Sequence, residues 1–93
     1  GTLLGLSGKY DIKADYENGK GYYDILMKSH NGSAPNIVIE LKRSEKENDR
    51  EADAKKALKQ IRNKDYAHGL KGQTILYGIS FFGKEPYIVS EVL

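Results

Sequence analysis

Asn36-Ile37-Val38-Ile39-Glu40-Leu41-Lys42 is the stretch of this 93-residue chain that decides its fold. The stretch is short and rich in β-branched residues, which predicts a strand, and its nearly continuous apolar character predicts that the strand is central in a sheet. A second short run, residues 22–28, has the same character. Residues 29–35, between the two runs, are turn formers, so the simplest connection is an antiparallel hairpin with a loose loop.

This hairpin would bring two carboxylates together. A symmetric loop centred near Gly32 places Asp24 opposite Glu40, and opposed side chains lie about 4.5 to 5.5 Å apart at Cβ. Lys42 comes two residues after Glu40 and therefore falls on the same face of the sheet. We expect these three ionisable groups to converge.

Such a carboxylate pair needs a compensating charge. Two carboxylates about 4 Å apart repel by roughly 4 kcal/mol at an effective dielectric constant of about 20, which is a large penalty for a marginally stable domain. A divalent cation offsets that repulsion, because Mg²⁺ is commonly held by one or two protein carboxylates together with water and phosphate. Lys42 is the alternative counter-ion, and the group would then be a structural salt-bridge cluster. The residues alone leave both interpretations open.

The rest of the chain predicts a mixed α/β sheet with helices on its faces. Residues 2–8 have the pattern of the last turns of an apolar helix. A second helix begins within the charged residues 43–51 and ends before Gly69. Its apolar stripe consists of Ala54, Ala57, Leu58 and Ile61. Further strands are predicted over residues 10–16, 74–82 and 87–92. The order of elements is therefore α, β, β, β, α, β, β.

The composition describes one soluble domain over residues 1–93. Apolar residues make up 39% and charged residues 30%, which excludes a disordered chain, and no apolar run approaches the length of a membrane-spanning helix. The chain has no cysteine, which excludes thiol chemistry and fits a cytoplasmic location. Because it begins with glycine and has no signal-peptide pattern, we expect it to be part of a longer protein.

The net charge of +2 is too small to indicate nucleic-acid binding by itself, because 15 basic residues are nearly matched by 13 acidic ones. Their distribution matters more, since several basic residues gather on the second predicted helix. This basic stripe consists of Lys55, Lys56, Lys59, Arg62 and Lys64. It is either a phosphate-binding surface or an ordinary solvated helix face, and the sequence leaves the two equally open.

Four motifs follow one another along nearly the whole chain. They are residues 3–6 (Leu-Leu-Gly-Leu), residues 17–25 (Glu-x-Gly-x-Gly-x-x-Asp-Ile), residues 39–42 (Ile-Glu-Leu-Lys), and residues 57–61 (Ala-Leu-Lys-Gln-Ile) with Tyr66. With aspartate in the second strand and Glu-x-Lys in the third, this order resembles the catalytic core of the PD-(D/E)XK nuclease superfamily. More narrowly, the chain looks like the nuclease-like domain found C-terminal to predicted AAA-type ATPase domains. Tyr23 stands where the superfamily name has proline, a position that varies widely and contributes little chemistry.

The resemblance implies a restriction-endonuclease-like αβββαβ core with a divalent-cation site. Asp24 and Glu40 would ligate Mg²⁺ or Mn²⁺, with the Leu41 carbonyl as a further ligand. Lys42 would orient the attacking water or help to deprotonate it, and would stabilise the charge that develops on the phosphate.

Three further residues have two interpretations each. Gln60 lies at the edge of the apolar stripe, where a glutamine in related nucleases supports the site or contacts substrate, but a solubilising surface residue is nearly as good an interpretation. Tyr66 is interpreted as a packing residue rather than a site residue. Glu17 is interpreted as a turn residue, with a supplementary acidic ligand as the alternative.

The sequence and the resemblance together predict a metal-dependent nuclease domain that hydrolyses phosphodiester bonds of DNA or RNA, with DNA favoured. The expected partners are nucleic acid and a covalently linked or associated AAA-type ATPase domain, without a membrane, and a homodimer is compatible with the sequence. The competing interpretation is a catalytically silent module of the same fold that binds nucleic acid or docks onto its ATPase. The set of Asp24, Glu40 and Lys42 argues against that module, which does not need all three on one face.

Overall fold

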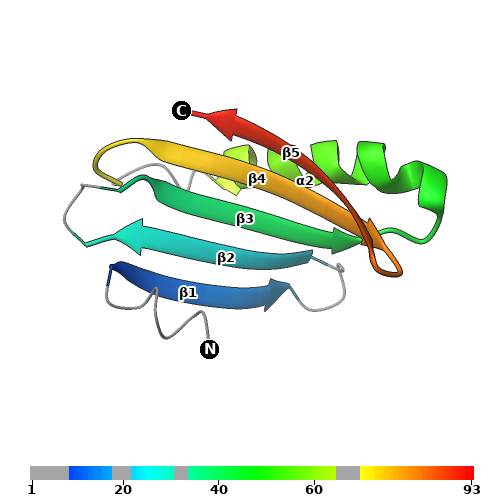
Figure 1. Cartoon of the computed structure of the whole chain (residues 1–93), viewed down its shortest axis with the longest axis horizontal. Coiled ribbons are helices and arrows are strands. Elements are labelled where there is room, and N and C mark those ends of the chain that lie inside the picture. Colours follow the sequence, from blue (N-terminus) through cyan, green and yellow to red (C-terminus); the bar gives the residue numbers. More distant parts are fainter. Residues whose placement is uncertain (1–8, 18–21, 31–33, 65–69) are drawn as a thin grey trace.

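The computed structural model describes residues 9–17, 22–30, 34–64 and 70–93, which form one mixed β-sheet with a helix packed on it (Figure 1). Along the chain the elements are β1 (Tyr10–Glu17), β2 (Tyr22–Ser29), β3 (Asn36–Arg43), the 3₁₀ helix η1 (Glu47–Asp49), α2 (Arg50–Lys64), β4 (Thr74–Phe82) and β5 (Glu85–Val92). The five strands lie side by side in chain order, with β1 and β5 at the edges (Figure 1). Only β3 and β4 are parallel among these neighbours, because α2 carries the chain back across the sheet between them.

All five predicted strands and the second predicted helix are confirmed, with strand ends that differ by at most two residues. The prediction of helices flanking the sheet is wrong for the described ranges, where α2 is the single α-helix. The reason is topological: the other connections between these strands join antiparallel neighbours, so only the β3-to-β4 crossover needs a helix. The helix predicted over residues 2–8 lies outside the described residues. None of the helices in the described part of the chain has the length and apolarity that a membrane-spanning helix needs.

The core lies between the sheet and α2. Alternate residues of β4 are buried, as expected for a strand with one face covered by a helix. Val38 of β3, Ile61 of α2 and Leu76 of β4 form the centre of this core, and each is at most 1% exposed. Ala54 and Ala57 are also fully buried, so the predicted apolar stripe is confirmed as the side of α2 that faces the sheet.

A glycine allows the helix to approach the sheet closely. A Cβ atom added to Gly78 of β4 would lie 2.3 Å from the Ala54 carbonyl oxygen and 2.7 Å from the Leu58 amide nitrogen. Both are backbone atoms of α2, which cannot swing aside as a side chain can. Gly78 pairs with Glu40 of β3, so the closest contact of helix and sheet lies directly beside that carboxylate.

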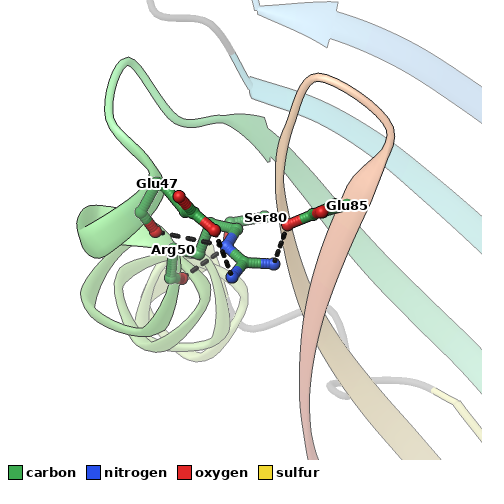
Figure 2. Close-up of polar contacts among 4 residues, drawn as sticks. All are labelled: Glu47, Arg50, Ser80 and Glu85. Atoms are coloured by element: carbon green, nitrogen blue, oxygen red, sulfur yellow. Dashed lines mark hydrogen bonds and ion pairs between the residues drawn. The ribbon is translucent and has the colours of Figure 1, made fainter.

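Polar contacts of Arg50 hold the first turn of α2 against the β4–β5 hairpin (Figure 2). Its Nε donates a hydrogen bond to the Glu47 carbonyl at 3.1 Å, and its guanidinium lies 3.5 Å from the Glu85 carboxylate. The hydroxyl of buried Ser80 in β4 donates to the Arg50 carbonyl. Together these contacts and the close approach at Gly78 set where α2 lies along β4.

We predict that Gly78→Ala lowers the free energy of unfolding by about 1 to 3 kcal/mol, because the new methyl group overlaps the backbone of α2. Urea unfolding followed by circular dichroism measures this loss. Ser90→Ala, at an exposed strand position in β5, is the control and should change the value by less than about 0.5 kcal/mol. Equal unfolding midpoints for Gly78→Ala and the unmodified chain would contradict the close approach.

Candidate functional site

Two buried carboxylates lie side by side on β2 and β3. Asp24 pairs directly with Glu40 in the antiparallel register, which confirms the prediction made from the hairpin loop. Asp24 is 5% exposed and Glu40 is fully buried. Both face α2, because opposed residues share a face and Glu40 is also opposite Gly78, which α2 contacts.

The row of acidic residues continues into the edge strand. Asp15 of β1 pairs with Asp24, so three carboxylates stand abreast across β1, β2 and β3, although Asp15 is exposed. Our sequence reasoning did not select Asp15. The same pairing rule sets Asp15 opposite Asp24 only when the connection is placed at residues 18–21, whereas the turn predicted at residues 17–21 would set Ala14 there.

The ammonium group of Lys64 lies against both buried carboxylates. Its Nζ donates to Asp24 Oδ2 at 2.6 Å and to Glu40 Oε1 at 3.3 Å. Lys64 is the last residue of α2, so the C-terminal end of the helix places this positive charge at β2 and β3. Burial lowers the pKa of the Lys64 ammonium from its ordinary value, and the negative charge of Asp15 opposes part of that shift.

Sequence reasoning placed Lys64 in the basic stripe and missed its contact with the carboxylates. A signal existed in the helical spacing, because Lys64 follows Ile61 by three residues and Ala57 by seven. It therefore continues the apolar stripe that faces the sheet. A lysine at such a position points its charge toward the sheet, where only buried acidic groups can accept it.

Lys42 lies on the same face as Glu40, as predicted, and contacts the first part of α2. Its Nζ is 3.9 Å from Oδ1 of Asp53, a buried residue of the helix. The other oxygen of Asp53 accepts a hydrogen bond of 2.7 Å from the Ser44 hydroxyl. Asp53 is thus held in place by Ser44 and forms an ion pair with the Lys42 ammonium. Sequence reasoning also missed Asp53.

The remaining predicted residues lie around this group. Gln60 is half-buried and comes one helical turn before Lys64, so both project from the same side of α2. Leu41 adjoins Glu40 in β3, and its side chain points to the opposite face of the sheet. Glu17 is the last residue of β1 and pairs with Tyr22, so its backbone belongs to a strand and the turn interpretation is wrong. Tyr66 lies outside the described residues.

The carboxylates of Asp24 and Glu40 fit a divalent cation whose remaining ligands are mostly water molecules. Within the described ranges, no group of three or more His, Asp or Glu side chains is arranged to hold a metal ion. The candidate side-chain ligands are therefore the pair Asp24 and Glu40. Mg²⁺ is commonly held by one or two carboxylates. Glu40 Oε2 is buried and accepts no hydrogen bond from the residues described here. The ammonium of Lys64 is a cation that the two carboxylates share.

Fold and site together define a class: α/β domains with a buried acidic pair on adjacent strands and a lysine two residues further along the central one. The sequence model of the PD-(D/E)XK nuclease superfamily matches residues 1–91. The chain belongs to this superfamily, which confirms the resemblance, and members of the superfamily typically use a divalent metal. No curated protein and no solved structure gives a significant match.

We predict that Lys64→Met lowers the free energy of unfolding of the metal-free chain by about 1 to 3 kcal/mol. The substitution leaves Asp24 and Glu40 close together without this ammonium, and the range lies below that of fully buried pairs because Lys64 keeps 24% of its side chain exposed. Urea unfolding in the presence of a chelator measures the effect.

Two further variants separate this effect from a simple loss of packing. Adding Glu40→Gln to Lys64→Met removes one of the two charges and should restore part of the lost stability. Lys56→Met, at an exposed position of the same helix, should change stability by less than about 0.5 kcal/mol. A double variant no more stable than Lys64→Met alone would contradict the electrostatic explanation.

Proposed function

We propose that this chain is a divalent-cation-dependent nuclease domain that hydrolyses phosphodiester bonds. The observation that carries the proposal is the buried, opposed pair of Asp24 and Glu40 in a member of a nuclease superfamily. A pair of this kind is costly in a small domain unless a cation compensates it. Lys42 on the same face provides a positive group beside the pair.

In this mechanism Asp24 and Glu40 would hold Mg²⁺ or Mn²⁺, and the Leu41 carbonyl would be a further ligand. When bound, such a cation supplies polarisation of the phosphate and a more acidic water at neutral pH. Lys42 orients the attacking water and meets the negative charge that develops on the phosphate, where a positioned donor has its greatest effect.

Neighbouring residues support these roles in the same proposal. Asp53 fixes the position of Lys42 through its 3.9 Å ion pair, so that the ammonium need not be ordered when substrate arrives. Gln60, half-buried one helical turn before Lys64, would support the carboxylate pair or contact the substrate.

The substrate in this proposal is nucleic acid, with DNA favoured over RNA, and the partner is an AAA-type ATPase domain. Lys55, Lys59 and Arg62 of the basic stripe are the proposed phosphate contacts, since all three are exposed. Two of them already form ion pairs, Lys55 with Glu51 and Arg62 with Glu91. Each would exchange an exposed carboxylate for a phosphate, which limits the gain in affinity.

A catalytically silent module of the same fold is the second candidate. One observation favours it: Lys64 already balances part of the charge of Asp24 and Glu40, so the pair has a cation of its own. In that case the three residues form a structural ion-pair cluster, and the domain acts by binding nucleic acid or docking onto its ATPase.

The cation site predicts that the chain binds Mn²⁺ and that Asp24→Asn abolishes this binding, because the amide removes one of two charged ligands. Isothermal titration calorimetry measures both. Asp11→Asn is the matched control, since Asp11 is an exposed carboxylate of β1 paired with His30 and should leave Mn²⁺ binding unchanged. If Asp24→Asn binds Mn²⁺ as tightly as an unmodified chain that itself binds the ion, this site is excluded and the silent module is favoured.

The proposed role of Lys42 predicts that Lys42→Ala lowers the rate of phosphodiester cleavage by about a hundredfold or more, as for removal of one transition-state donor. Folding and Mn²⁺ binding should be nearly unchanged. Cleavage of a labelled DNA substrate with Mg²⁺ by the protein that contains this domain measures the rate, with Lys46→Ala as the control at an exposed lysine. Normal cleavage by Lys42→Ala would refute the mechanism, and failure of this variant to fold would support the salt-bridge cluster.

A further inference from the structure

One cation already occupies the space between Asp24 and Glu40. The ammonium of Lys64, the last residue of α2, lies 2.6 Å from Asp24 and 3.3 Å from Glu40. This is a different role from that of Lys42, whose ammonium is held by Asp53 on the first part of the same helix. The two lysines therefore contact different acidic residues: Lys64 of α2 contacts Asp24 and Glu40, whereas Lys42 of β3 contacts Asp53.

The two cations would compete for the same carboxylates. Lys64 already contacts one oxygen of Asp24 and one of Glu40. Exposed Asp15 adds a third negative charge beside the pair, so the competition is for oxygen atoms and not for net charge. A divalent ion shared by Asp24 and Glu40 takes at least one oxygen from each, and an ammonium 2.6 Å from the same carboxylate would then lie next to it. Like charges at that separation in a half-buried site repel, which favours displacement of the ammonium.

Lys64 is placed so that its ammonium can move away from the two carboxylates. Its side chain is 24% exposed, whereas the side chains of Asp24 and Glu40 are 7% and 0% exposed, so the ammonium is the component of the group that has access to solvent. A lysine has four methylene groups and can move its charge by several ångströms through rotamer changes alone. The carboxylates, by contrast, are fixed by their places in two paired strands of the sheet.

We propose that Lys64 is a tethered counter-ion that occupies the cation position in the metal-free protein and is displaced when a divalent cation binds to Asp24 and Glu40. The inference rests on the proposed function, because it assumes that the two carboxylates form a metal site. It explains how a small domain keeps two buried carboxylates close together without metal. It also makes Lys64 a determinant of cation affinity, since binding must compete with the ammonium for the same oxygens.

Amine labelling of the unmodified chain tests the displacement directly. An acylating reagent is added with and without saturating Mn²⁺, and the modification of each lysine is followed by mass spectrometry. Lys64 should react several-fold faster with Mn²⁺, because its ammonium leaves the carboxylates, whereas exposed Lys56 should react at the same rate. An unchanged or slower reaction of Lys64, in a chain that calorimetry shows to bind Mn²⁺, would overturn the proposal.

Substitutions give a second measurement that does not depend on activity. Lys64→Met removes the competing charge and should bind Mn²⁺ about tenfold more tightly, which corresponds to a site that is open about a tenth of the time in the unmodified chain. Lys64→Arg keeps the charge and should bind with nearly the original affinity, and Lys56→Met should not differ from the unmodified chain.

The outcomes separate this inference from the proposed function. If the unmodified chain binds Mn²⁺ and Lys64→Met binds it equally or more weakly, displacement is wrong while the cation site stands. If neither the unmodified chain nor Lys64→Met binds Mn²⁺, the cation site itself is wrong and the displacement with it. Binding by Lys64→Met alone would support both, with Lys64 as a strong competitor.

Discussion

Two buried carboxylates that share one lysine ammonium constrain the arrangement of β2, β3 and α2. Asp24 and Glu40 can lie together in the interior only if β2 and β3 keep one register, because a shift by one residue would move a side chain to the opposite face. Their charge also requires a cation nearby, and Lys64 at the end of α2 supplies it. Strand register and helix position are thus coupled through a single polar group.

The packing of α2 on the sheet determines where Lys64 meets the two carboxylates. Small residues at the contact, Gly78 on the sheet and Ala54 on the helix, let the two backbones approach more closely than ordinary side chains would allow. Arg50 and its contacts hold the first turn at the β4–β5 hairpin. With its start and middle fixed, α2 presents Asp53 to Lys42 near one end and Lys64 to the carboxylates at the other.

This division between two lysines connects the fold to the proposed chemistry. Lys42 is held by a buried carboxylate of the helix and is therefore kept in place, as a group that assists phosphate chemistry must be. Lys64 is more exposed than the acidic pair it contacts, and its role is to compensate charge. In the proposed mechanism the same carboxylates would be compensated by Lys64 without metal and would bind the cation when it is present, without a change in the sheet.

Local pattern in the sequence determined the strands, the second helix, and the pairing of Asp24 with Glu40, because alternation and turn composition act over a few residues and leave few choices of register. The pairing of Asp15 with Asp24 follows from the same rule only with the turn at residues 18–21, a bound that the structure supplied. Only the tertiary structure decided that Lys64 rather than Lys42 contacts the acidic pair, since Lys64 is 40 residues from Asp24 and 24 from Glu40. The helical spacing indicates that Lys64 faces the sheet, but which residues of the sheet it meets depends on how α2 lies across the strands, which the close approach at Gly78 helps to set.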